Sequence, residues 1–449
     1  MLNRETNRIK LSDHFTYGRL LRFCLPSIVM IIFTSIYGVV DGFFISNYAG
    51  KTALAAVNLI MPYIMVIGTL GFMFGAGGSA LVSMTLGAGK KKKANEYFSM
   101  IVEVTLILGV ISSILSMIFI KQILRGLGAT EEMMPYAINY GIIGMMSNTG
   151  YALQNVFQSF FVAAEKPKYG LFYTIAAGLT NIVLDYVFLG IFSFGVTGAS
   201  FATFISECVG GYLPIIYFAR KSNNSLLYLH FVRIELVPIF KAMLNGLSEL
   251  LSDVSTSLVS MVYNAQLLYF IGSDGVAAYG VMMYVAFIFT AIFMGYSVGT
   301  APLIAYNYGA KTNNELKNIL KKSLYMMLLS GILMSILGYI FSTPLSYLFV
   351  GYDEKLRELT DYAGKIFALQ FLFAGFNIFA SAFFTALNNG LISGLISALR
   401  VIVFKLSFVL ILPIILGSSG IWYANPLSEI CSLIVGIIFM IKEKKNYGY

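Results

Sequence analysis

The chain alternates twelve long apolar segments with short polar connections, and no other feature constrains its fold as strongly. A transmembrane helix needs about 20 consecutive apolar residues. Segments of at least that length lie at 20–45, 53–76, 97–120, 134–163, 169–190, 196–219, 236–271, 276–306, 323–350, 359–387, 391–416 and 421–441. Charged residues make up only 11% of the chain, whereas soluble domains carry about a quarter. We therefore expect an all-α integral membrane protein with twelve transmembrane helices.

Lysine and arginine fall mainly on one side of this twelve-span arrangement. They cluster in the first 22 residues, at 90–93, 166–168, 220–241 and 311–322, and in the tail at 442–445. The opposite side has only Lys51, Lys121, Arg125, Lys355 and Arg357. Basic residues concentrate in cytoplasmic loops. We therefore expect a multi-pass protein with both termini in the cytoplasm and no removable signal peptide.

The chain repeats itself after 222 residues. This shift aligns GGSALVSMTLGA (77–88) with GTAPLIAYNYGA (299–310), and 155–164 with 377–386 and 195–207 with 417–429. Six spans per repeat make both halves enter the membrane from the same side, and in such transporters the site lies near the interface of the halves. We expect an N-terminal six-helix bundle at 1–219, a linker at 220–235 and a C-terminal bundle at 236–449.

Two carboxylates break the apolar rule in the first half alone. Asp41 on the first span and Asp185 on the fifth align with Tyr263 and Ser407 after the shift, and neither mate is charged. A charge in the middle of a bilayer costs at least about 2.5–3.5 kcal/mol, so it is a candidate functional residue. Asn181 lies one helical turn before Asp185 and shares its face. Neighbouring spans offer further oxygens on Thr203, Asn155 or Gln158.

This polar group admits two chemistries and one structural alternative. Carboxylate, amide and hydroxyl oxygens can coordinate a hard monovalent cation, and burial makes a carboxyl group hold a proton more readily. The alternative is a polar network that only joins helices, at about 0.6 kcal/mol per contact. We favour the functional interpretation.

Other polar residues in the spans are open to structural explanations. Glu249 and Asp253 share a face of the seventh span and could pair with Arg400 or Lys405, or form a second acidic site. Glu207 and Glu429 are repeat mates, and we expect both near cytoplasmic helix ends in a shared architectural role. Pro26 frees a backbone carbonyl in the first span and permits a kink, so it is a candidate hinge.

Several classes of function find no support in the sequence. Cys24, Cys208 and Cys431 are far apart inside apolar segments, and His14 and His230 are the only histidines. No nucleophile–base pair or metal-type spacing is present, so we expect neither an enzyme nor a cofactor. The net charge of +9 is placed at segment ends, without a basic stripe, which argues against nucleic-acid binding.

The chain resembles the multidrug and toxic compound extrusion (MATE) transporters. The resemblance rests on the two parallel halves, on GGSALVSMTLGAGKKKKA and its mate GTAPLIAYNYGAK, and on residues 163–203 with N-x-x-L-D followed by G-V-x-G-A. That last stretch is similar to the bacterial branch that includes DinF-like and MepA-like members, and the resemblance covers nearly the whole chain.

The resemblance implies a V-shaped protein of the bacterial cytoplasmic membrane that exports organic, often cationic, drugs in exchange for protons or sodium. Its coupling ion, H+ or Na+, would bind Asp41, Asn181, Asp185 and Thr203, with a span-four amide on Gln158 or Asn155. Pro26 matches the family's bending proline. A second-half site of the NorM-like type would have Glu249 and Asp253 but, on the tenth span, only Asp361 near its outer end.

The resemblance also suggests a monomer in membrane lipid whose partners are small-molecule drugs, with a role in antibiotic resistance. The alternative is a flippase for a lipid-linked saccharide or a related amphiphile. Such a protein needs a cationic cavity, for which this chain offers only Arg400 and Lys405 against several acids. The sequence therefore favours cationic cargo.

Overall fold

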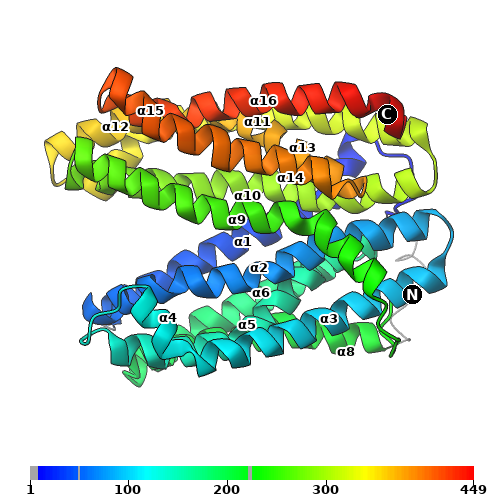
Figure 1. Ribbon diagram of the computed structural model, residues 1–449, viewed down its shortest axis with the longest axis horizontal. Coiled ribbons are helices and arrows are strands. Elements are labelled where there is room, and N and C mark those ends of the chain that lie inside the picture. Colours follow the sequence, from blue (N-terminus) through cyan, green and yellow to red (C-terminus); the bar gives the residue numbers. More distant parts are fainter. Residues whose placement is uncertain (1–8, 49–50, 221–224) are drawn as a thin grey trace.

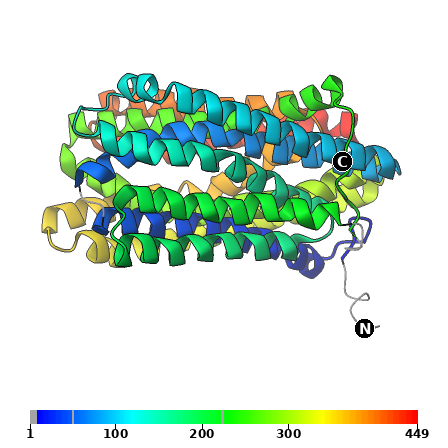
Figure 2. The ribbon, with the colours of Figure 1, turned by 90° about the horizontal axis from the view of Figure 1, so that it is seen from below.

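The computed structural model describes residues 9–48, 51–220 and 225–449, which form helices and connections without a strand. Part of the predicted linker, 221–224, and the basic residues Arg4, Arg8 and Lys221 lie outside this range. Within it, the long helices run roughly parallel in two views at right angles (Figure 1, Figure 2).

The first half of the chain forms one group of helices and the second half another (Figure 1). The first group comprises α1 (Tyr17–Tyr48), α2 (Lys51–Gly87), α3 (Lys91–Ile118), α4 (Ile120–Gly126), α5 (Met134–Ala163), α6 (Pro167–Asp185), η2 (Tyr186–Ile191), α7 (Gly195–Glu207), η3 (Cys208–Tyr212) and α8 (Leu213–Ala219). The second comprises α9 (Leu236–Phe270), α10 (Ser273–Gly309), α11 (Asn313–Val350), α12 (Glu354–Ala368), α13 (Phe371–Ala386), α14 (Gly390–Ala398), η5 (Leu399–Lys405), α15 (Leu406–Leu416) and α16 (Ser419–Tyr447). We call them the first and second bundles.

Nine of the described helices or helix runs are long and apolar enough to cross a membrane, and α12 with α13, bent by 46°, makes a tenth. The predicted count of twelve depends on α5 and α9, which have membrane-spanning lengths of 30 and 35 residues but more polar sequences. The α5 helix is rich in amides, and α9 carries Glu249 and Asp253. Both polar helices pack against α2, so their polar side chains face protein rather than lipid.

Glycines bring the two bundles into backbone contact at the lysine-rich end, where α1 begins and α16 ends (Figure 1). A Cβ on Gly87 would overlap the Tyr306 carbonyl, and one on Gly309 would overlap the Met84 carbonyl. Met84 and Tyr306, like Gly87 and Gly309, are 222 positions apart. The contact between α2 and α10 is therefore symmetric under the repeat.

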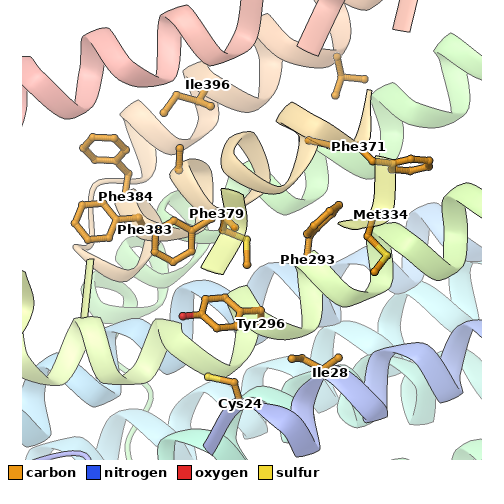
Figure 3. Close-up of a cluster of buried hydrophobic side chains, with 14 of the residues drawn as sticks. Cys24, Ile28, Phe293, Tyr296, Met334, Phe371, Phe379, Phe383, Phe384 and Ile396 are labelled. Carbon is orange, nitrogen blue, oxygen red and sulfur yellow. The ribbon is translucent and has the colours of Figure 1, made fainter. Parts of the chain in front are cut away.

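The contacts of α2 with α9 and of α10 with α1 form a second symmetric set. Gly246 of α9 abuts the Met73 carbonyl of α2, and Gly299 of α10 abuts Cys24 of α1. Around Cys24 and Ile28, aromatic side chains of α10 and α13 form a continuous core that includes Phe293 and Tyr296 (Figure 3). The start of α1 thus packs into the second bundle, although α1 belongs to the first by sequence.

A short segment before α1, residues 9–16, holds both bundles at the same end, and we call it the N-terminal strap. The Leu11 amide donates to Glu165 Oε1 of the first bundle at 2.8 Å. The Phe15 amide donates to Glu315 Oε1 of α11 at 2.9 Å, and Lys322 Nζ donates to the Phe15 carbonyl at 2.6 Å. The strap adds polar contacts to the glycine-mediated packing.

We predict that Gly246→Ala destabilises the protein, because the added methyl would overlap the backbone of α2. Overpacking of this kind costs about 1–3 kcal/mol, which should lower the midpoint of thermal unfolding in detergent. Gly280→Ala in α10 is the control, since a Cβ there meets no atom within 4 Å. That variant should be unchanged or slightly more stable, and equal effects of the two substitutions would contradict the proposed contact.

Candidate functional site

Asp41 and Asp185 face each other in the interior of the first bundle. Asp41 lies on α1 and is 6% exposed, whereas Asp185 is the last residue of α6 and is fully buried. The two carboxyl groups are within hydrogen-bonding reach of each other. The sequence placed them 144 positions apart, and the packing of α1 against α6 brings them together.

The oxygens of this carboxyl pair lack protein donors. Asp41 Oδ1 and both carboxyl oxygens of Asp185 are buried, and none accepts a hydrogen bond from any residue that the structure describes. Two ionised carboxylates in contact repel each other, whereas one proton between them makes a hydrogen bond and a cation would bind both. The pair is therefore chemically complete only with a bound proton or cation.

Asn181 and Thr203 lie beside this pair as predicted from helix spacing. Asn181 Nδ2 donates to Thr203 Oγ1 at 3.4 Å, which leaves the buried Asn181 Oδ1 without a donor among the described residues. No cluster of three or more His, Cys, Asp or Glu that could hold a metal occurs in the described part of the chain. The available donors are carboxylate, amide and hydroxyl oxygens, which suit a proton or a hard monovalent cation.

The two predicted span-four amides make other contacts. Gln158 Nε2 donates to Thr174 Oγ1 at 3.2 Å, and Asn155 Nδ2 donates to the Tyr151 carbonyl at 3.0 Å. Both side chains are buried. Neither amide is hydrogen-bonded to Asp41 or Asp185, so the structure assigns them to helix packing around the pair.

A second buried carboxylate of the first bundle, Glu207, was interpreted differently from the sequence. We predicted a position near a helix end, but Glu207 lies midway along the run Gly195–Ala219 and is 4% exposed. That prediction is wrong because a π-helical segment continues the span beyond it. Its Oε2 has no partner among the described residues.

Tyr37 and Gln154 connect Glu207 with the carboxyl pair, and the sequence analysis missed both. Gln154 Nε2 donates to the Tyr37 hydroxyl at 3.4 Å, and Tyr37 lies within electrostatic range of both Glu207 and Asp41. Gly210 leaves room for the Gln154 amide, since a Cβ there would overlap it. The amide-rich sequence of α5 was the available signal, whereas Tyr37 is one of 29 tyrosines.

The repeat mate of Glu207 has a different environment. Glu429 of α16 accepts from Arg400 at 2.8–3.0 Å and from Asn377 Nδ2 at 2.7 Å, and Lys405 lies within electrostatic range. Asn377 is the repeat mate of Asn155. The second bundle therefore compensates its buried carboxylate with a cation, and the first bundle does not.

This ion pair also overturns the expected pairing of Glu249 and Asp253 with Arg400 or Lys405. Arg400 is engaged by Glu429 instead, because the π-helical segment η5 directs it towards α16. Asp253 Oδ2 accepts from Thr69 Oγ1 of α2 at 3.5 Å. The acids of α9 thus lie where the two bundles meet. Asp361, the tenth-span candidate, pairs with Lys365 at 2.7 Å and is unsuited to a shared site.

Each π-helical segment in the described part of the chain adjoins a buried charged residue. The η2 segment follows Asp185, η3 follows Glu207, and η5 contains Arg400 and Lys405. A π-helical turn re-aims side chains and is frequent at functional sites. Hydropathy reports none of these segments, so the sequence could not show them.

Comparison with known proteins identifies the family. The MatE family model matches the chain twice, at residues 26–187 and 250–411. The chain belongs to the MATE family. The two matches are offset by 224 residues (250 − 26), close to the repeat of 222 found in the sequence.

Curated relatives place the chain near the MepA branch of MATE proteins. It is 26% identical to the multidrug export protein MepA of Staphylococcus saprophyticus over 95% of this chain and 94% of the relative. MepA of Staphylococcus aureus is 25% identical with the same coverage. The predicted family and branch are confirmed.

Solved structures show the same fold. An outward-facing multidrug resistance MATE transporter superposes with a TM-score of 0.91, at 22% identity over 98% of both chains. A MOP superfamily transporter from Pyrococcus furiosus gives a TM-score of 0.89 at 23% identity, again over 98% of both chains. The predicted all-α MATE membrane fold is confirmed.

We predict that Arg400→Leu destabilises this MATE protein by about 3–5 kcal/mol, because it leaves Glu429 buried without a counter-charge. Arg400→Leu combined with Glu429→Gln should recover much of the loss, since the neutral amide can still accept from Asn377. Thermal unfolding of both variants in detergent is the measurement. A double variant as unstable as the single one would show that Arg400 acts through packing alone.

Proposed function

We propose that this MATE protein exports organic, mainly cationic compounds across the bacterial cytoplasmic membrane in exchange for protons or sodium ions. The carboxyl pair of Asp41 and Asp185 carries this proposal. Its oxygens lack protein donors among the described residues, so its occupancy by a small cation has a large effect on local charge. The curated relatives are named multidrug export proteins, which supports drugs as the cargo.

The proposed mechanism is an exchange of charge in the first bundle. With the pair ionised and empty, its negative charge favours a cationic drug. Binding of a proton or a sodium ion neutralises the pair, weakens the hold on the drug and lets α1 shift relative to α6. Such coupling requires the ion to bind the two conformations with different affinity, and Asp41 on α1 provides the difference because α1 contacts both bundles.

We assign the lysine-rich end to the cytoplasm, because basic residues concentrate on that side of membrane proteins. The glycine contacts and the N-terminal strap hold the bundles together at this end. The described conformation would therefore be closed to the cytoplasm and correspond to an outward-facing state. Its similarity to an outward-facing MATE structure supports this assignment.

The flippase alternative is less well supported by the charges. A lipid-linked pyrophosphate needs free cationic side chains, but Arg400 is bound to Glu429. Buried acids outnumber buried bases around the helices that line the interior of the first bundle. Cationic cargo fits this arrangement better than anionic cargo.

Transport by purified protein in liposomes tests the proposal directly. A fluorescent organic cation should accumulate inside when the interior is acidic, if protons are exchanged, or when the interior is loaded with sodium, if sodium is exchanged. Each gradient is imposed alone, with the membrane potential clamped. Accumulation that ignores both gradients, or none with either, would reject an ion-coupled exporter.

We predict that Asp185→Asn reduces ion-driven uptake to the level of empty liposomes, because an amide neither ionises nor shares a proton. Asp274→Asn is the matched control, since Asp274 is exposed in the first turn of α10. Both variants should insert and elute as the parent does. Undiminished uptake by the Asp185 variant would remove that residue from the coupling site.

A further inference from the structure

A basic pocket of about 440 Å³ lies at the lysine-rich end, between the two bundles. Four of its lining residues are lysines: Lys90 and Lys93 from the first bundle, and Lys241 and Lys311 from the second. The volume falls within the range of ordinary ligand sites. This pocket has no part in the proposed exchange at Asp41 and Asp185.

The four lysines are free to bind a ligand. None of them forms an ion pair with a carboxylate that the structure describes. Lysines near helix ends often cap backbone carbonyls, but no hydrogen bond from these four amines to a carbonyl occurs in the described ranges, whereas Lys322 makes one. Glu96 and Glu235 lie within electrostatic range of Lys93, so four cations face two carboxylates and the pocket stays positive.

Two helix N-termini add to the positive potential. The pocket is lined by Lys93 in the first turn of α3 and by Val237 and Pro238 in the first turn of α9. Neither α3 nor α9 has a side-chain hydrogen bond at its N-cap. Helix N-termini favour anions, above all phosphate groups. Lysines and helix ends together therefore select for a phosphate-bearing ligand.

The remaining lining is apolar and points to an amphiphile. Leu81 and Met84 of α2 and Val237 of α9 face the same pocket as the lysines. Basic pockets between transmembrane helices at a membrane surface hold anionic lipid headgroups. Inorganic phosphate would satisfy the lysines, whereas a lipid phosphate would also cover the apolar wall.

We propose that this pocket binds the phosphate of an anionic membrane lipid and that the bound headgroup joins the two bundles. The contribution of two lysines from each bundle carries the second part, because one anion then neutralises charges on both sides of the contact. A lipid in this position stabilises the conformation in which the lysine-rich end is closed. The proposal is independent of the transported cargo and of which membrane face this end occupies.

The test compares lipid retention by two variants that lose the same charge from the same end. The pocket variant carries Lys90→Gln, Lys93→Gln, Lys241→Gln and Lys311→Gln. The control carries Lys91→Gln, Lys92→Gln, Lys317→Gln and Lys321→Gln, all exposed residues outside the pocket. The full-length protein is reconstituted in phosphatidylcholine nanodiscs with phosphatidylglycerol, and the retained phosphatidylglycerol is counted by native mass spectrometry after release.

We expect the pocket variant to bind phosphatidylglycerol on the order of tenfold more weakly than the parent, and the control to bind it as the parent does. Equal losses in both variants would overturn the proposal, because they would indicate diffuse surface attraction. If the fourfold variant does not fold, the pairs Lys90→Gln with Lys93→Gln and Lys241→Gln with Lys311→Gln replace it. Each pair should weaken retention, and a loss confined to one pair would refute the bridging role.

Inorganic phosphate distinguishes the two sources of the anion. In detergent without lipid, phosphate alone should raise the unfolding temperature of the parent less than phosphatidylglycerol does. A pocket-dependent rise with phosphate that matches or exceeds the effect of the lipid would overturn the lipid as the ligand.

Discussion

A carboxylate buried away from water must find a proton, a cation or hydrogen-bond donors, and the rest of this structure depends on how each buried acid meets that requirement. Glu429 meets it permanently through Arg400 and Asn377. Asp41, Asp185 and Glu207 have no such cation within the described part of the first bundle. Their charge state must therefore change with what binds, and this makes the first bundle the responsive half of a duplicated scaffold.

The duplication explains how two halves with different roles share one architecture. Contacts between the bundles obey the repeat, as Gly87 with Tyr306 and Gly309 with Met84 show. The buried charges do not obey it, because Arg400 aligns with Gly178 and Asp185 with Ser407. Backbone packing has kept the symmetry, while the side chains that decide ion binding differ between the bundles.

The sequence was sufficient for the helices and for the acids that meet, and insufficient for their surroundings. Long apolar segments and the lysine pattern predict the spans to within a few residues, since a bilayer leaves the backbone no alternative to helix. Asn181 beside Asp185 follows from helical spacing. The partner of Arg400 and the central position of Glu207 do not, because π-helical segments change which face a residue occupies and leave no hydropathy signal. Tyr37 and Gln154 are recognisable only once α1, α5 and α7 are placed in space.

The α1 helix is shared between the bundles, and this has a mechanical consequence. Its first turns, with Cys24, are fixed in the core of the second bundle, and its last turns carry Asp41 to α6 of the first. Gly38 and Gly42 flank Asp41 with open space around them, so this part of the helix can bend without a clash. Any relative rotation of the halves must displace the Asp41 carboxyl group from Asp185, and any change in the charge between those two groups must pull on the joint between the halves. One continuous helix thus acts as both the sensor of the ion and the lever that moves the scaffold.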